Sequence, residues 1–321
     1  EIASCLVGSE MCIRDSLFPG QGAQSIGMGK DLYENYQEVR DIYENVHKIT
    51  GVDIKKITFD GTEQELSKTQ NTQIAVLTNS LAILKLLEKK GINAEISAGL
   101  SLGEYTALIY SKCISFEDGV KLVKKRGEYM QNLLPEGDWA MAAILGLEDE
   151  KVEEVCKKVV DGFVVPVNYN TQGQVVISGE KTAVEQAEII AKEMGAKKVR
   201  ILKTSGPFHT KKLIEASNAL RKDLEKININ KFKTKVVKNI NGDIYKDEEN
   251  IKDILAEHMI SPVKFSKCLE TMLKMEIDTF VEIGPGKTLS GFVKRMKTEK
   301  EIKIYNICDV KSLENTLKEI N

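Results

Sequence analysis

The sequence predicts an α/β protein in which a mostly parallel sheet carries a small inserted domain. Apolar segments typical of strands alternate with amphipathic helical segments along most of the 321 residues. At 99–103 the motif "GLSLG" joins one such strand to a helix through a serine between two glycines. Between 137 and 205 the order of elements becomes β-α-β-β-α-β, which is the ferredoxin-like unit.

The first half of the chain opens with the end of a strand and a glycine-rich loop, in "LFPGQGAQSIGMG" at 17–29. The next segment has apolar residues at spacings of three or four, which places these on one helical face: Leu32, Tyr36, Val39, Tyr43 and Val46. A second helix is expected over 72–90, with Gly91 suited to end it. The strand "AEISAG" then leads into the serine turn, and helices follow from 104 and over 116–133.

The insert follows Pro135. Its segments are the strand "WAMAAILGL", the helix "EDEKVEEVCKKV", the strands "VVPVNYN" and "QGQVVISG", the helix "KTAVEQAEIIAKEMG" and the strand "KVRILKT". The chain returns through a loop and helix in "SGPFHTKKLIEAS", a strand in "KFKTKVVKNING", and a strand, turn and helix in "TFVEIGPGKTLSGFVKRM". We therefore expect a large α/β domain formed by 1–136 and 206–321, and a small domain formed by 137–205.

Composition narrows the function classes. The chain is 42% hydrophobic and 29% charged with a formal net charge of -2, so nothing indicates nucleic acid as a partner. No apolar run reaches the roughly 18 residues that a membrane span needs. The six cysteines are scattered without a C-x-x-C pair, which argues against a disulfide framework or a zinc site. We expect a cytoplasmic protein without a metal or a membrane partner.

Ser101 is the candidate nucleophile. In G-x-S-x-G a strand turns sharply into a helix and presents the serine hydroxyl at the apex, and glycines fit where side chains would clash. The alternative is a glycine- and serine-rich loop, because the pentapeptide also occurs by chance. The backbone N–H of Leu102 is one possible donor to an oxyanion, and the loop at 20–22 could bring a second.

A serine nucleophile needs a base, and the chain has three histidines. His47 falls within the first amphipathic helix, where a surface position is expected. His258 falls late in another helix and could be structural. His209 lies in the loop "TSGPFHTKK", where the chain re-enters the large domain, so elimination favours His209 as the base.

Six motifs in order resemble one family. They are "FPGQGAQSIGMG", "GLSLGEYTAL", "RGEYMQ", "PVNYNTQGQVVISG", "GPFHT" and "VEIGPGKTLSGF", and they run from about residue 17 to about residue 296. Together they closely resemble the malonyl-CoA:acyl carrier protein transacylases of bacterial fatty acid synthesis. The resemblance implies a hydrolase-like α/β core with a ferredoxin-like insert. It also implies Ser101 as nucleophile, His209 as base, and the backbone N–H groups of Gln21 and Leu102 as the oxyanion hole.

Further roles follow from the resemblance alone. An arginine in the helix after the serine pairs with the free malonyl carboxylate in this family, and the context R-G-x-x-M-Q puts that role on Arg126. Met130 is then expected in the same pocket. Phe208 is expected to restrict α-branched acyl groups because it stands beside the base. The base is held by a backbone carbonyl, which here belongs to His258 where relatives commonly have glutamine. The alternative for Arg126 is a solvated surface charge.

The implied reaction moves malonyl from malonyl-CoA to the phosphopantetheine thiol of an acyl carrier protein through a malonyl-serine, without a bound cofactor. The carrier protein is expected to dock on a basic face that includes Lys211 and Lys212, the alternative being a solvated charge run. A monomer is the expectation, although the sequence leaves the oligomeric state open. Alternative functions are a trans-acting acyltransferase of a polyketide pathway, a serine thioesterase or hydrolase, and a non-catalytic docking subunit.

One segment departs from the family. The first strand is normally apolar up to F-P-G, whereas here Arg14, Asp15 and Ser16 precede "LFPGQG". Helices cover both faces of a parallel sheet, so its strands are expected to be apolar throughout. We therefore expect residues 1–16 to be a non-native leader.

Overall fold

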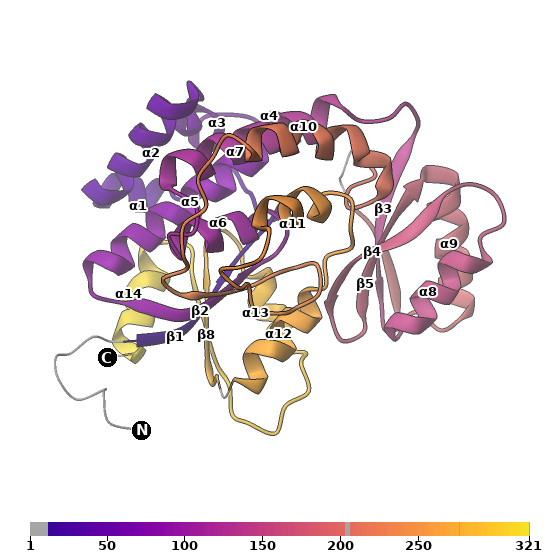
Figure 1. The fold of residues 1–321 in the computed structure, drawn as a ribbon. Coiled ribbons are helices and arrows are strands. Elements are labelled where there is room, and N and C mark those ends of the chain that lie inside the picture. The colour runs from indigo at the N-terminus through magenta and orange to yellow at the C-terminus, as the bar shows by residue number, and fades with distance from the viewer. Residues whose placement is uncertain (1–11, 203–205, 276, 321) are drawn as a thin grey trace.

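The structure is a computed structural model that describes residues 12–202, 206–275 and 277–320. Its main sheet has five strands in the order β7-β2-β1-β8-β9, and every neighbouring pair is parallel. These strands are β1 (Cys12–Phe18), β2 (Asn93–Gly99), β7 (Lys235–Val237), β8 (Thr279–Ile283) and β9 (Lys303–Ile307). Because Phe18 pairs with Gly99, the glycine-rich loop and the serine turn leave the sheet at the same edge (Figure 1).

Helices surround this sheet (Figure 1). They are α1 (Lys30–Asn35), α2 (Gln37–Thr50), α3 (Ile54–Phe59), α4 (Glu63–Leu66), α5 (Thr69–Lys89), α6 (Leu102–Tyr110), α7 (Phe116–Asn132), α10 (Ile214–Leu224), α11 (Ile251–His258), α12 (Phe265–Lys274), α13 (Thr288–Val293) and α14 (Val310–Ile320). None of the helices among the described residues combines the length and apolar character needed to cross a membrane.

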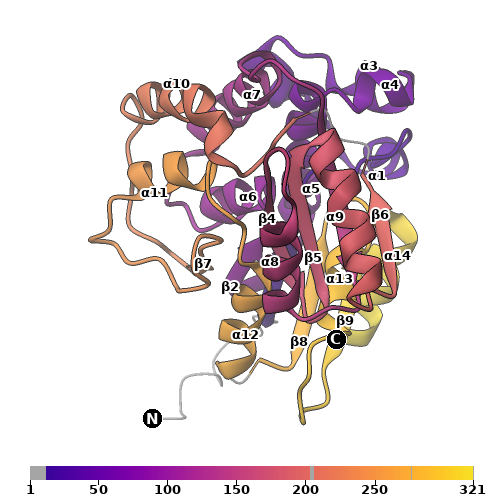
Figure 2. The same ribbon diagram turned by 90° about the vertical axis from the view of Figure 1, so that its right-hand side faces the viewer.

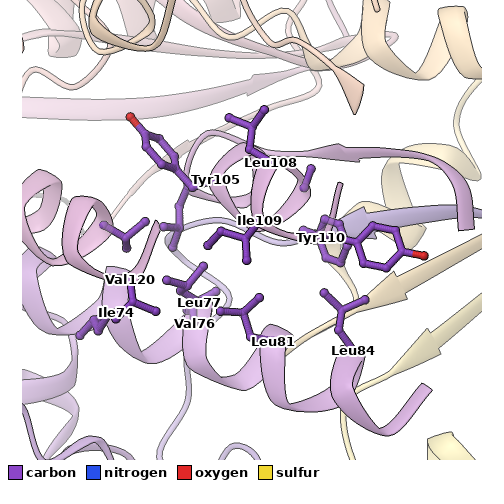
Figure 3. Packing of buried hydrophobic residues seen from close by; sticks show 14 of the residues in the cluster. Ile74, Val76, Leu77, Leu81, Leu84, Tyr105, Leu108, Ile109, Tyr110 and Val120 are labelled. Atoms are coloured by element: carbon purple, nitrogen blue, oxygen red, sulfur yellow. The ribbon is translucent and has the colours of Figure 1, made fainter. Parts of the chain in front are cut away.

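Helix α5 forms the centre of the large core. Residues on every side of it are buried, as expected for a helix that is enclosed by other elements. Figure 3 shows Leu77 and Leu81 of this helix on the side that faces Ile109 of α6, and Ile74 and Tyr105 belong to the same buried cluster. Because α6 begins directly after Ser101 and α7 also packs on α5, this core fixes the helices that carry the site.

The second sheet is antiparallel and has the order β4-β5-β3-β6. Its elements are β3 (Trp139–Leu145), α8 (Asp149–Lys158), β4 (Val164–Thr171), β5 (Gln174–Glu180), α9 (Lys181–Glu193) and β6 (Lys198–Ile201). Helices α8 and α9 cover its outer face (Figure 2). This strand order with two helices on one face is ferredoxin-like, so the predicted fold class is confirmed.

The small sheet is joined to the large domain by backbone hydrogen bonds. The Tyr169 N–H of β4 donates to the Val263 carbonyl at 2.9 Å, and the Val263 N–H donates to the Val167 carbonyl at 2.8 Å. Val263 precedes α12, which packs on the large sheet. The predicted domain boundaries near 136 and 206 stay a prediction.

Two differences from the sequence-based expectations concern the first third of the chain. The single helix expected around Tyr36 is two helices, because Tyr36 is extended (φ -127°, ψ 127°) between α1 and α2. The polar end of the expected leader lies in β1, the central strand, where Asp15 and Ser16 are buried. Residues 1–11 lie outside the described residues, and the non-native origin of the leader stays a prediction.

Candidate active site

The turn at Ser101 is sharply bent. Ser101 has φ 53° and ψ -99°, a conformation that residues with a side chain rarely adopt. A Cβ atom on Gly99 would lie 1.9 Å from the Gly103 carbonyl carbon, and one on Gly103 would lie 2.1 Å from the Phe18 carbonyl oxygen. The two glycines of G-x-S-x-G are therefore required because the strand, the turn and the following helix touch through their backbones.

Asn239 holds this turn from the next strand of the sheet. It follows β7, and its Oδ1 accepts a hydrogen bond of 2.7 Å from the Ser101 N–H. Its Nδ2 donates to the Gly99 carbonyl oxygen, also at 2.7 Å. Sequence analysis missed this residue. The one available signal was its place at the carboxyl end of a strand, the edge at which α/β sheets bind ligands.

Ser101 and His209 form a dyad. Ser101 Oγ and His209 Nε2 are 2.7 Å apart, and His209 Nδ1 donates to the His258 carbonyl oxygen at 3.0 Å. Burial, and secondarily the charge of Arg126, lowers the pKa of His209 to about 4. At neutral pH the ring is therefore uncharged, with its proton on Nδ1 and a free lone pair on Nε2 facing the serine hydroxyl. This is the state that a general base requires.

Arg126 reaches the same serine from α7. The side chain is fully buried, which excludes the alternative of a solvated surface charge. Its Nη2 donates to Ser101 Oγ at 3.0 Å, and its Nη1 donates to Gln73 Oε1 at 2.8 Å. Within the described ranges Arg126 forms no ion pair with a carboxylate, and the arginine that does is Arg221. The site therefore contains a buried cation close to the serine hydroxyl, a favourable place for an anionic substrate group.

The remaining predicted residues surround this centre. Met130 is buried, and its sulfur accepts a hydrogen bond of 3.1 Å from Nε2 of Gln73, the same amide that binds Arg126. Phe208 is buried next to His209. Gln73 was missed by sequence analysis because an amide within a long apolar helix carries no motif.

The loop that contains Gln21 packs against the serine turn. A Cβ atom on Gly20 would lie 2.3 Å from the Leu100 carbonyl oxygen, and the Leu100 N–H donates to the Phe18 carbonyl at 3.0 Å. This contact brings the backbone of Gln21 towards the start of α6, where Leu102 lies. The oxyanion-hole role of the Gln21 and Leu102 N–H groups stays a prediction. In the described part of the chain, no cluster of histidine, cysteine or acidic side chains is suited to hold a metal ion.

Fold and site together place the chain in the class of serine-dependent acyl-transfer enzymes. Residues 17–311 match the acyl transferase domain family. The malonyl CoA-acyl carrier protein transacylase of Bacillus subtilis is 40% identical over 310 residues, covering 95% of this chain and 97% of the relative. The chain therefore belongs to the acyl transferase domain family, and within it to the malonyl CoA-acyl carrier protein transacylases. The resemblance inferred from the six sequence motifs is confirmed.

Solved structures agree with this assignment. The malonyl CoA-acyl carrier protein transacylase of Clostridium perfringens is 44% identical with a TM-score of 0.90, covering 95% of this chain and 96% of that one. A malonyl-transacylase in complex with a type II PKS acyl-carrier protein is 36% identical with a TM-score of 0.90, covering 95% of this chain and 99% of that one.

Proposed function

We propose that this enzyme transfers a malonyl group from malonyl-CoA to the phosphopantetheine thiol of an acyl carrier protein, with Ser101 carrying the group between the two. The names of the relatives support the activity. The observation that carries it for this chain is the buried guanidinium of Arg126, 3.0 Å from the serine hydroxyl. Such a cation favours an acyl group with a carboxylate and gives no advantage to a simple acyl group.

In the first half-reaction, His209 Nε2 takes the proton of Ser101 Oγ as the oxygen attacks the thioester carbonyl. A C–O bond forms, and the negative charge on the carbonyl oxygen is stabilised by the backbone N–H groups of Gln21 and Leu102. The intermediate then breaks its C–S bond, and the CoA sulfur receives the proton from His209. The product is a malonyl ester of Ser101 and free CoA.

The second half-reaction is the reverse with a new thiol. His209 takes the proton of the phosphopantetheine thiol, sulfur attacks the ester, and the C–O bond to Ser101 breaks. The proton returns to Ser101 Oγ, so the enzyme ends in its starting state. Protons and acyl group balance over the two steps without a bound cofactor or metal.

Arg126 gives this chemistry its preference for malonyl. Taking a carboxylate out of water costs several kcal/mol unless a partner compensates it, and a guanidinium does so with two parallel hydrogen bonds. Met130 and Phe208 form the apolar part of the same pocket in this proposal. Phe208 adjoins the base, so its ring limits the room for a branch at the α-carbon.

The test is the mass of the acyl-enzyme. Incubation with malonyl-CoA should add one malonyl group to the peptide that contains Ser101, and the adduct should be stable to water but discharged by phosphopantetheinylated carrier protein. A Ser101→Ala variant is the control. Rapid discharge by water without carrier protein would indicate a thioesterase, and absence of an adduct on a folded enzyme would contradict the proposal.

A second candidate is malonyl loading of a polyketide carrier protein, because one similar structure holds a type II PKS acyl-carrier protein. Comparison of kcat/KM for a fatty acid carrier protein and a polyketide carrier protein separates the two pathways.

For either partner we place docking at the exposed Lys211 and Lys212, which follow the base. We also propose a cytoplasmic location and a monomeric state. Gel filtration at micromolar concentration tests the monomeric state.

A further inference from the structure

One buried carboxyl group lies behind the dyad. Glu104 is three residues after Ser101 on α6, and it is 1% exposed. Its Oε1 accepts hydrogen bonds from the Tyr245 hydroxyl at 2.6 Å and from the Asn239 N–H at 3.2 Å. Its Oε2 lies 3.1 Å from His258 Nδ1. None of these contacts belongs to the substrate pocket described above.

Two of these three partners of Glu104, Asn239 and His258, are residues that support the dyad. Asn239 holds the Ser101 turn through its side chain. His258 holds the base, because its carbonyl oxygen accepts from His209 Nδ1. The His258 ring is buried, and neither of its nitrogens has a well-formed hydrogen bond in the described part of the chain, but Glu104 Oε2 lies within 3.1 Å of Nδ1 as an electrostatic contact. A single carboxyl group therefore connects the support of the nucleophile to the support of the base.

Burial decides where the proton of this pair lies. It raises the pKa of Glu104 to about 7, and it lowers the pKa of His258 well below its ordinary value, with His209 and Arg126 adding to the decrease. Both directions favour a neutral imidazole beside a protonated carboxyl group over a pair of opposite charges. Because Oε1 already accepts from two donors, Oε2 is the oxygen left to carry the proton, and it lies beside His258 Nδ1.

We propose that Glu104 is a positioning residue of the transfer reaction, which through the contact of its carboxyl group with the buried His258 ring fixes the carbonyl that orients His209. His209 has a positive φ of 58° and a buried ring, and its Nδ1 donates to the His258 carbonyl at 3.0 Å, with the Ser261 backbone as a lesser partner. If the carbonyl shifts, Nε2 turns away from Ser101 Oγ. The proposal rests on the proposed function for the identity of the acyl group but not for the geometry of the dyad.

The geometry distinguishes two substitutions at this position. In Glu104→Gln, the amide oxygen still accepts from Tyr245 and Asn239, and the NH₂ group takes the place of the Oε2 hydroxyl beside His258 Nδ1, so the variant copies the protonated acid. Glu104→Ala removes all three contacts. Rotating the glutamine to accept from His258 would turn its NH₂ group onto the Asn239 N–H, so this variant does not copy an ionised carboxylate.

The experiment measures kcat and KM for malonyl-CoA per malonylated serine, together with the rate at which a fluorophosphonate probe labels Ser101. Counting malonylated serines removes the effect of any misfolded fraction. We expect Glu104→Ala to lower kcat and the labelling rate about 10- to 100-fold with KM nearly unchanged, as a small displacement of a base does. Glu104→Gln should stay within about threefold of wild type.

A matched control is Glu282, another buried carboxyl group, which binds Leu289 N–H and Ser290 and does not contact His258. Glu282→Ala should lower thermal stability while the rate per site stays within about threefold of wild type. If Glu104→Ala fails to fold, His258→Ala removes the same contact from the other side and should give the same loss of kcat. His258→Gln keeps a side chain that can accept from Glu104, so its kcat should be close to that of the wild type.

Three results would overturn the proposal. They are a rate per site for Glu104→Ala within threefold of wild type, a Glu104→Gln variant as slow as Glu104→Ala, or losses that add in the double variant Glu104→Ala, His258→Ala. Failure of the proposed function looks different. The wild type would then form no malonyl-enzyme, and the labelling rates of the same variants would still decide the role of Glu104.

Discussion

The enzyme carries positive charge in two neighbouring regions, one buried and one exposed to solvent. The difference in burial gives the two charges different effects on binding. Arg126 lies at the bottom of the site, fully buried and bonded to Ser101. Lys211 and Lys212 lie just beyond His209 and are exposed, and the Lys212 ammonium is 5.0 Å from the Phe163 ring centre and 5.8 Å from that of Trp139. In sequence all three are simply basic residues near the motifs.

The difference follows from the surrounding dielectric. Around Arg126 water is excluded, so an anion that reaches it gains a strong interaction and an uncharged group gains none. At the lysines the field is screened by salt within about 8–10 Å, so it guides a large acidic partner without selecting a small one. We therefore expect the buried region to control which acyl group reacts and the exposed region to control which carrier protein receives it.

The largest expected effect lies in the buried region and concerns the dyad. Ser101→Ala should abolish malonyl labelling, because the atom that forms the ester is gone. His209→Ala should lower kcat by about a thousandfold or more, as nucleophile and base act as a unit. Intact-mass measurement after incubation with malonyl-CoA checks both variants. A malonyl adduct on folded Ser101→Ala protein would show that another residue is the nucleophile.

Arg126 is expected to come next in magnitude. Arg126→Ala should lower kcat/KM for malonyl-CoA about 100-fold and raise acetyl transfer relative to malonyl, because a buried carboxylate loses its partner at a cost of about 2–5 kcal/mol. Arg126→Lys should recover part of the loss, since it restores the charge without the planar fork. The exposed Arg200 on β6 provides the control variant Arg200→Ala. An unchanged ratio of malonyl to acetyl transfer would rule out this role.

The same arginine should also set the pH range of the base. The pKa of His209 is lowered to about 4 by burial first and by Arg126 second. Since the base works only when neutral, activity should persist as pH falls and be lost near pH 4. In Arg126→Ala the second cause is absent, so the loss should begin at a higher pH, closer to the ordinary value of 6.5. The rate of fluorophosphonate labelling as a function of pH checks this. An unchanged pH profile in Arg126→Ala would show that Arg126 does not lower the pKa of His209.

The buried region also shows what sequence reasoning reached and what it missed. The serine turn was predictable because its glycines are dictated by local backbone contact, and His209 because few histidines compete for the role. Asn239 and Glu104 were missed. Their partners are Ser101 and His258, 138 and 154 residues away in sequence, and no local pattern separates a buried polar side chain from a solvated one.

The fold class was predicted correctly, but two details of the fold were missed for a related reason. The apolar spacing around Tyr36 continues through the break between α1 and α2, so periodicity alone predicts one helix. Strand β9 lies at the edge of the sheet and is half-buried, so apolar and polar residues alternate only weakly in its sequence. This strand was therefore not predicted. Elements enclosed on both sides, such as β2 and α5, were predicted because burial itself makes their sequences apolar.

The exposed region should give a smaller effect of a different kind. Reversing the charges of Lys211 and Lys212 to glutamate should raise KM for the carrier protein about tenfold at low salt and less at high salt, while KM for malonyl-CoA stays nearly constant. The adjacent exposed lysines of α8, Lys157 and Lys158, offer the matched control pair. Equal changes in both KM values would place the effect in the pocket instead of at a docking face.

The smallest expected effect tests the apolar side of the buried region. Phe208 adjoins the base and is 4% exposed, so Phe208→Leu should open space beside the reacting carbonyl. Methylmalonyl transfer should rise about 2- to 10-fold relative to malonyl, because one extra methyl in an apolar pocket is worth roughly 1 kcal/mol. Phe265→Leu removes the same volume from a separate core cluster and controls for general loosening. If both variants change the methylmalonyl ratio alike, the selectivity arises from flexibility of the whole core, and the wall beside His209 is not what excludes the branch.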